Sequence, residues 1–127
     1  MSSYNQLKHI FHDAALSSDI AGILHWDMST MMPKNSRENR AEQLAYLSKV
    51  RHQLISSNKV GELILKAKDE SLDDENRANL REMEREYIMS SALPSDLVEK
   101  YQVLLQSVRV YGKKPEKNQI SKLFYHF

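Results

Sequence analysis

The sequence contains no cysteine, and only three of its 127 residues are glycine and three are proline. Without cysteine, the chain forms no disulfide bond and no zinc site with thiolate ligands. With so few glycines and prolines, it has few positions that break a helix or form a tight turn. No apolar run approaches the ~20 residues of a membrane-spanning helix, and the opening stretch lacks the basic-then-apolar order of a signal peptide. We therefore expect a soluble cytoplasmic protein.

Net charge is also close to zero, because 18 basic side chains balance 17 acidic ones. Proteins that bind nucleic acid or anionic membranes electrostatically carry a clear basic excess. We therefore expect neither nucleic acid nor membrane as a partner. Hydrophobic residues make up 41% of the chain and charged residues 28%, which is ordinary for one soluble domain of this length.

Apolar residues recur at helical spacings almost throughout the chain, and no segment is typical of a strand. Leu7, Ile10, Phe11 and Ala14, for example, share one face of a helix that begins near Tyr4. We predict an all-α fold, an antiparallel helical-bundle-like fragment of a larger helical fold. Breaks between helices are expected near Ser17–Asp19, Met31–Asn35, Ser56–Asn58, Ser71–Asp73 and Leu93–Ser95.

Serines stand where several of these helices are expected to begin. Ser17 and Ser18 are expected to cap the second helix, Ser36 the third and Ser95 the last. Pro33 ends the helix before it, because the residue that precedes a proline is pushed away from helical dihedral angles.

One local cluster has metal-binding residue types. His9, His12 and Asp13 stand at i, i+3 and i+4, so they share one edge of a helix. Imidazole and carboxylate groups suit zinc, but a complete site needs a further ligand, for which His25 is the nearby candidate. Such spacing is common by accident. Two surface imidazoles on an amphipathic helix are therefore the favoured interpretation, and we predict no metal site in this chain.

The stretch "LHWDMSTMMP" raises the question of a catalytic site. His25 and Asp27 are the residue types of an acid–base pair, but residues two apart on a helix do not face each other. We favour a structural role. Trp26 is expected to be a mostly buried anchor, and Asp27 to accept hydrogen bonds from the backbone, Arg37 or Arg40.

A basic stripe of Arg77, Arg81 and Arg85 recurs at every fourth residue. Nucleic-acid binding would need such a stripe without neutralising partners. Glutamates are interleaved with it, and Arg81 and Glu84 stand at pairing distance on a helix. We therefore predict a solvated, charge-laced helix face.

Three methionines, Met28, Met31 and Met32, would suit an adaptable binding surface, but core filling at a helix end is the commoner role and the one we predict. The sequence has no glycine-rich phosphate loop, no GxSxG and no HExxH. The residues by themselves therefore predict a helical domain with no catalytic, cofactor-binding or metal-ligating residue.

Four blocks of sequence resemble the opening region of the carboxypeptidase Taq family of zinc metallocarboxypeptidases. The first two are LHWD followed by Thr30 and "MP", and "RAEQLA" with the arginine before it. The later two are "NLREMEREY" and "ALPSDLVEK". In this chain the blocks are Leu24–Asp27 with Thr30 and Met32–Pro33, Arg37 with Arg40–Ala45, Asn79–Tyr87, and Ala92–Lys100. The resemblance covers roughly residues 4 to 100, and its four ordered blocks make it specific.

The resemblance implies an all-helical enzyme that uses a zinc ion to remove C-terminal residues from peptides. The family holds that zinc with an HExxH helix and a later glutamate, and it is several times longer than this chain. Because those ligands have no counterpart in these 127 residues, no family site residue is carried over. We expect zinc in the full-length family, none in this chain, and an inactive chain on its own.

Residues 101–127 depart from the family pattern. With a suitable choice of permitted codons, the nucleotides for residues up to Phe124, grouped one position earlier, can spell LSSATSKCEGVWKKARKESDFKAF. This text resembles what the family has after "LPSDLVEK". We therefore divide the chain into a family-like region, residues 1–100, and an out-of-frame tail, residues 101–127. The loss of a nucleotide near the codon for Lys100 or Tyr101 would make the chain a truncated N-terminal fragment.

Two partners follow from this interpretation. Helices that are adapted to a larger body expose apolar surface, which a homodimer or the missing catalytic portion of the parent enzyme would cover. The alternatives to a truncated enzyme are a small helical binding module and a subunit of a split enzyme whose catalytic part is encoded separately.

The nucleotide sequence of the gene tests the interpretation of the tail. We expect the frame shifted by one position after the codon for Lys100 to spell the family-like text and to lead on towards an HExxH motif. A shifted frame that meets a stop codon before Phe124, or spells unrelated residues, would contradict the frameshift.

Overall fold

The computed structural model describes residues 1–111, with side chains described as far as residue 105. Within that range the chain forms helices and no strand. They are α1 (Ser3–Thr30), the short 3-10 helix η1 (Lys34–Ser36), α2 (Arg37–Ser56), α3 (Asn58–Ala67), α4 (Asp74–Ser91) and α5 (Ser95–Tyr111). The predicted all-α fold is confirmed. Of the predicted tail, residues 101–127, the part from residue 112 onwards lies outside the residues that the structure describes.

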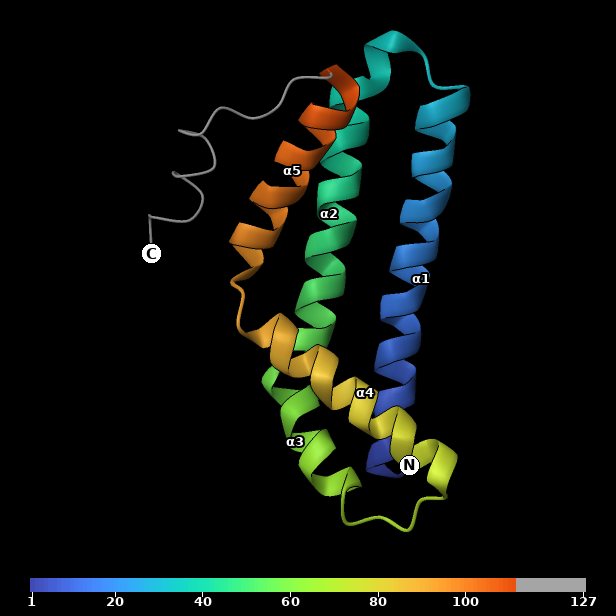
Figure 1. Ribbon diagram of the computed structural model, residues 1–127, viewed down its shortest axis with the longest axis vertical. Helices are drawn as coiled ribbons and strands as arrows, with labels where there is room; N and C mark the ends of the chain where they lie inside the picture. Colours follow the sequence, from blue (N-terminus) through green and yellow to red (C-terminus); the bar gives the residue numbers. More distant parts are fainter. Residues whose placement is uncertain (112–127) are drawn as a thin grey trace.

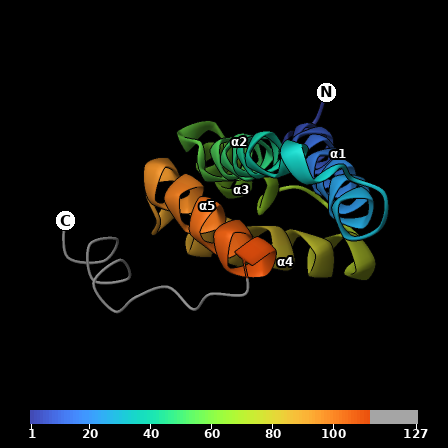
Figure 2. The ribbon, with the colours of Figure 1, turned by 90° about the horizontal axis from the view of Figure 1, so that it is seen from above.

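The long helices run side by side and reverse direction at each turn. In Figure 1, α1 ascends, α2 descends beside it, and α5 ascends along α2. The helix α4 crosses the lower end of this layer obliquely, with α3 below it. Seen from above, α1 and α5 pack on different sides of α2 (Figure 2). None of the helices in the described range is long and apolar enough to cross a membrane.

The densest part of the core lies where the first half of α1 packs against α3 and α4. Its buried side chains are Tyr4, Leu7, Val60, Leu63, Ile64, Ala67, Leu80 and Met83. Each fully buried aliphatic side chain contributes roughly 1.5–3 kcal/mol. The predicted apolar face of the first helix is confirmed, since Leu7 and Ala14 are buried and Ile10 and Phe11 are partly buried against this core. A further buried group (Ala14, Leu44, Ala45 and Ile55) joins α1 to α2.

Polar contacts fix the first turn of α1 to the loop after α3 and to the start of α4. The hydroxyl of Tyr4 donates to Asn76 Oδ1 (2.9 Å) and accepts a hydrogen bond from Asn79 Nδ2 (3.0 Å). The carboxylate of Glu70 accepts hydrogen bonds from the backbone N–H groups of Ser3 (2.7 Å) and Tyr4 (3.3 Å). A negative charge at a helix N-terminus is favourable because its N–H groups are partly positive.

The predicted break at Ser17–Asp19 is wrong, because α1 continues through these residues for 28 residues in all. The hydroxyl of Ser17 donates to the carbonyl oxygen of Asp13 (3.3 Å), and that of Ser18 donates to Ala14 (3.4 Å). Serines that bond back to the preceding turn satisfy themselves inside a helix and do not cap a new one. The other four predicted breaks agree with the ends of the helices.

His52 holds the turn between α4 and α5 against α2. It is buried, and its Nε2 lies 2.6 Å from the carbonyl oxygen of Ser90 while its Nδ1 lies 3.0 Å from Ser95 Oγ. Because a carbonyl only accepts, Nε2 carries a hydrogen and donates it. The Ser95 hydroxyl is thus engaged by His52 at the start of α5. Ser36, directly before α2, makes no side-chain capping bond.

Gly61 on α3 permits a close approach by α4. A Cβ added at Gly61 would lie 2.6 Å from Tyr87 Oη and 2.9 Å from its Cζ, closer than real Cβ contacts. Gly22 on α1 is different, since a Cβ added there would meet nothing within 4 Å. The two helical glycines of the described chain therefore have different physical roles.

We predict opposite effects for the same substitution at these two positions. Gly61→Ala should lower the free energy of unfolding by about 1–3 kcal/mol, because Tyr87 must move. Gly22→Ala should raise it by about 0.5–1 kcal/mol, because alanine is the better helix former and has open space. Urea unfolding of both variants measures the difference. A Tyr87→Ala background should abolish most of the Gly61→Ala penalty, and a penalty that persists there would contradict the clash.

Candidate functional site

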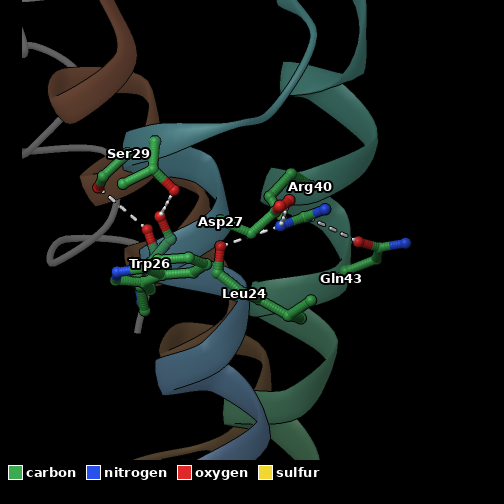
Figure 3. A network of polar contacts seen from close by, with 8 residues as sticks. Leu24, Trp26, Asp27, Ser29, Arg40 and Gln43 are labelled. Atoms are coloured by element: carbon green, nitrogen blue, oxygen red, sulfur yellow. Dashed lines mark hydrogen bonds and ion pairs between the residues drawn. The ribbon is translucent and has the colours of Figure 1, made fainter.

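The "LHWD" stretch ends α1 and is joined to α2 by one side chain, Arg40. Arg40 Nη1 lies 2.9 Å from Asp27 Oδ2 and donates to the carbonyl oxygen of Leu24, also at 2.9 Å. Its Nε donates to Gln43 Oε1 (3.1 Å). Figure 3 shows Arg40 reaching from α2 to these two acceptors on α1. The prediction that Asp27 is bonded within the protein is confirmed, with Arg40 as its partner.

Trp26 does not have the predicted place. Its side chain is 64% exposed, and in Figure 3 it lies on the opposite side of α1 from Arg40. Successive residues of a helix point about 100° apart, so the turn of α1 that directs Asp27 towards α2 directs Trp26 away from it. The prediction of a buried anchor is therefore wrong for the described chain.

The methionines after Trp26 differ from one another in exposure. Met28 and Met32 are half-buried, but Met31 is 74% exposed, so the predicted core-filling role is wrong for Met31. The backbone N–H groups of Met31 and Met32 both donate to the carbonyl oxygen of Asp27 (2.9 and 3.0 Å), which closes the end of α1. The stretch thus makes a helix junction.

The histidine cluster lies at the other end of α1. His9 and His12 are exposed, and they line a shallow hollow of about 460 Å³ with Met1, Asn5 and Lys8. Lys8, which lines the same hollow, has its Nζ over the Tyr4 ring, 5.4 Å from the ring centroid. Among the residues that the structure describes, no three His, Asp or Glu side chains are close enough to hold a metal.

The further ligand considered for this cluster is also distant. Because α1 is one continuous helix, His25 is separated from His12 by thirteen residues, or about 20 Å along the axis at 1.5 Å per residue. The described residues therefore do not fit a zinc ion, and no chemical step is assigned to one here. The absence of a metal site from the whole chain stays a prediction.

The basic stripe on α4 is solvated, as predicted. Arg77 and Arg81 are exposed, and Arg85 pairs with Glu82 (3.5 Å) while both remain largely exposed. The predicted partner of Arg81 is engaged elsewhere, since Glu84 binds Lys68 Nζ at 2.6 Å. This pair ties the end of α3 to α4.

Two further ion pairs between helices were not predicted. Arg51 on α2 binds Glu86 on α4, and Lys49 on α2 lies 3.1 Å from Glu99 on α5. Like the contacts of His52, they join residues far apart in the sequence. The only signal for His52 was its spacing, seven residues after Ala45 and three before Ile55, which places it on the apolar face of α2. These polar contacts position helices.

Comparison with known proteins identifies the family. The model of the carboxypeptidase Taq (M32) metallopeptidase family matches residues 6–119. The chain belongs to this family. The matched region includes the junction of α1 and α2. Of the described helices it leaves out only residues 3–5 at the start of α1.

Two curated relatives that match this chain are both named carboxypeptidases. The chain is 28% identical over 100 residues to Thermostable carboxypeptidase 1 of Thermus thermophilus, which covers 76% of this chain and 20% of the relative. It is 28% identical over 103 residues to Carboxypeptidase 1 of Bacillus subtilis, which covers 80% of this chain and 20% of the relative. The matched region thus spans about a fifth of each relative's length. No solved structure gives a significant match.

We predict that stability depends on Arg40 more than on Trp26. Arg40→Met should cost about 1.5–3 kcal/mol, because it removes charged hydrogen bonds from a side chain that is only 15% exposed. Trp26→Ala should cost no more than about 0.5–1 kcal/mol, since exposed substitutions have small effects. Urea unfolding measures both. A loss of about 3 kcal/mol or more for Trp26→Ala, as expected for a buried aromatic, would contradict the exposed position.

Proposed function

We propose that this chain supplies the N-terminal helical portion of a carboxypeptidase Taq-type enzyme and is inactive without the zinc-bearing portion. The observation that carries the proposal is the family match over residues 6–119 in a chain that covers only a fifth of each relative. The reaction of the assembled enzyme is the release of C-terminal residues from peptides, with zinc polarising the scissile carbonyl and activating water.

The role of this chain in that enzyme is structural. Its described polar clusters join helices to helices through Arg40, His52 and Glu70, and each is engaged in protein contacts. The histidines with the best spacing for zinc are at the exposed edge of α1, beside Lys8. We therefore assign the zinc ligands and the catalytic base to the other portion, and a scaffolding role to this one. We expect the protein in the cytoplasm.

We further propose that residues 101–127 are out of frame. The support is the family-like text that a shifted frame can spell after Lys100 with permitted codons. The observation against it is the family match, which includes residues 101–119 in the frame as given. The helix α5 runs from Ser95 to Tyr111 and so includes the start of this segment.

A small helical binding module is the second candidate function. The observation that favours it is the number of large apolar side chains that the described helices expose, among them Ile23, Trp26, Met31 and Leu65. Exposed apolar surface commonly marks an interface. In this version the chain pairs with a second copy of itself and has no part in peptide hydrolysis.

Metal analysis and complementation distinguish these functions. The full chain, purified without a metal-binding tag, should hold no stoichiometric zinc and release no C-terminal residues with added zinc or cobalt. Co-expressed with the Bacillus subtilis relative that lacks the matched segment, it should yield a complex with zinc and chelator-sensitive carboxypeptidase activity.

Two results would contradict the proposed function. One is a chain that alone binds one zinc and turns over substrate, with activity lost in a His9/His12 double variant. The other is a complex that never forms or holds no zinc.

A further inference from the structure

The second half of α1 carries an apolar face that no described part of the chain covers. Leu16, Ile20 and Ile23 follow one another at i, i+4 and i+7, and Trp26 stands three residues further on. Their side chains are 45%, 49%, 67% and 64% exposed. On a helix such spacings place neighbours along one side. We call these four residues the outer α1 face.

This face is fixed in orientation by the opposite side of the same helix. Arg40 binds the carboxylate of Asp27 and the carbonyl oxygen of Leu24, which holds the end of α1 against α2. The buried residues of α1, namely Tyr4, Leu7 and Ala14, all lie in its first half. The second half therefore contacts α2 along one side and presents the outer α1 face along another. Figure 3 shows this for Trp26, which lies on the side of α1 away from Arg40.

Gly22 lies beside this face, one turn before Trp26 and next to Ile23. A glycine inside a helix lowers helix stability relative to alanine. At Gly61 the close packing of Tyr87 explains the glycine, but at Gly22 nothing lies within 4 Å of an added Cβ. No contact in the described chain explains the missing side chain. An external backbone that approaches α1 closely at this point would explain it.

We propose that the outer α1 face is the docking surface for the zinc-bearing portion of a carboxypeptidase Taq-type protein, with the closest backbone approach at Gly22. The proposal rests on the proposed function. Residues 16–26 lie inside the family match, and four-fifths of each matched relative have no counterpart in the matched region of this chain. We therefore take this unmatched part of the enzyme as the occupant of the outer α1 face.

Complementation with surface variants tests the docking site. The probe is the Bacillus subtilis relative without the matched segment, co-expressed with the full chain as above. Ile23→Asp and Gly22→Leu should lower the yield of zinc-containing, active complex at least about tenfold, because a charge or a bulky side chain then enters the contact. The matched control is Met89→Asp on α4, which changes a side chain with the same 67% exposure as Ile23 and should leave the yield unchanged.

Thermal melts of the isolated chains separate docking from folding. Ile23→Asp and Met89→Asp should shift the melting temperature by similar amounts, because both are exposed helical positions. Gly22→Ala should raise the melting temperature of the isolated chain and still lower the yield of the complex. Only a role of Gly22 in the contact predicts that the melting temperature rises while the yield of the complex falls. If Gly22 affected folding alone, the melting temperature and the yield would change in the same direction.

The outcomes for the two proposals differ. If the wild-type chain forms no active complex, the proposed function fails and the docking site fails with it. If the wild-type complex is active but Ile23→Asp and Gly22→Leu behave like Met89→Asp, only the docking site is overturned. A wild-type chain that sediments as a dimer, and that Ile23→Asp converts to a monomer, would identify a second copy as the occupant and also overturn the proposal.

Discussion

The arrangement of the long helices depends on the contact between Arg40 and the last turns of α1. One guanidinium group binds a carboxylate and a backbone carbonyl oxygen on the neighbouring helix, at 2.9 Å each. Hydrogen bonds to a charged donor are among the stronger polar contacts in proteins. This contact gives the "LHWD" stretch a physical meaning, because Asp27 serves as a clamp for α2 and its neighbour Trp26 is thereby turned outwards.

The two ends of the described fold differ in how completely they are packed. Near the chain start, α1, α3 and α4 enclose a core that is closed by Tyr4 and Glu70. Near the end of α1, one side of the helix rests on α2 and large apolar residues face outwards. The difference lies in the buried core and not in apolar exposure alone, because Leu65 on α3 and Met89 on α4 are exposed as well. The matched region covers 20% of each family relative.

Periodicity predicted the parts of the fold that depend on local sequence. The spacing of Leu7, Ile10, Phe11 and Ala14 placed them correctly on the buried face of α1, because an amphipathic helix has one way to bury such a stripe. The break at Ser17 was predicted wrongly, since a serine caps a helix or bonds back into it with equally local chemistry.

Contacts between distant segments were beyond prediction. The pairing of His52 with Ser90 and Ser95 joins three helices, and neither spacing nor residue type specifies such a partner. Trp26 was misplaced for a related reason. Residue type predicts that a tryptophan is buried, but its burial depends on which elements pack against its side of the helix. Asp27 was placed correctly, because a carboxylate near two arginines has few alternatives.

The continuity of α1 has a consequence for how the molecule opens. Because a single helix runs from a buried first half to a more exposed second half, its amide groups are not expected to share one free energy of exposure. Those near Leu7 and Ala14 lie beside buried side chains, whereas those beyond Ile20 lie on a part of α1 that has no fully buried side chain. Solvent exchange is therefore expected to be faster in the second half of this helix than in the first.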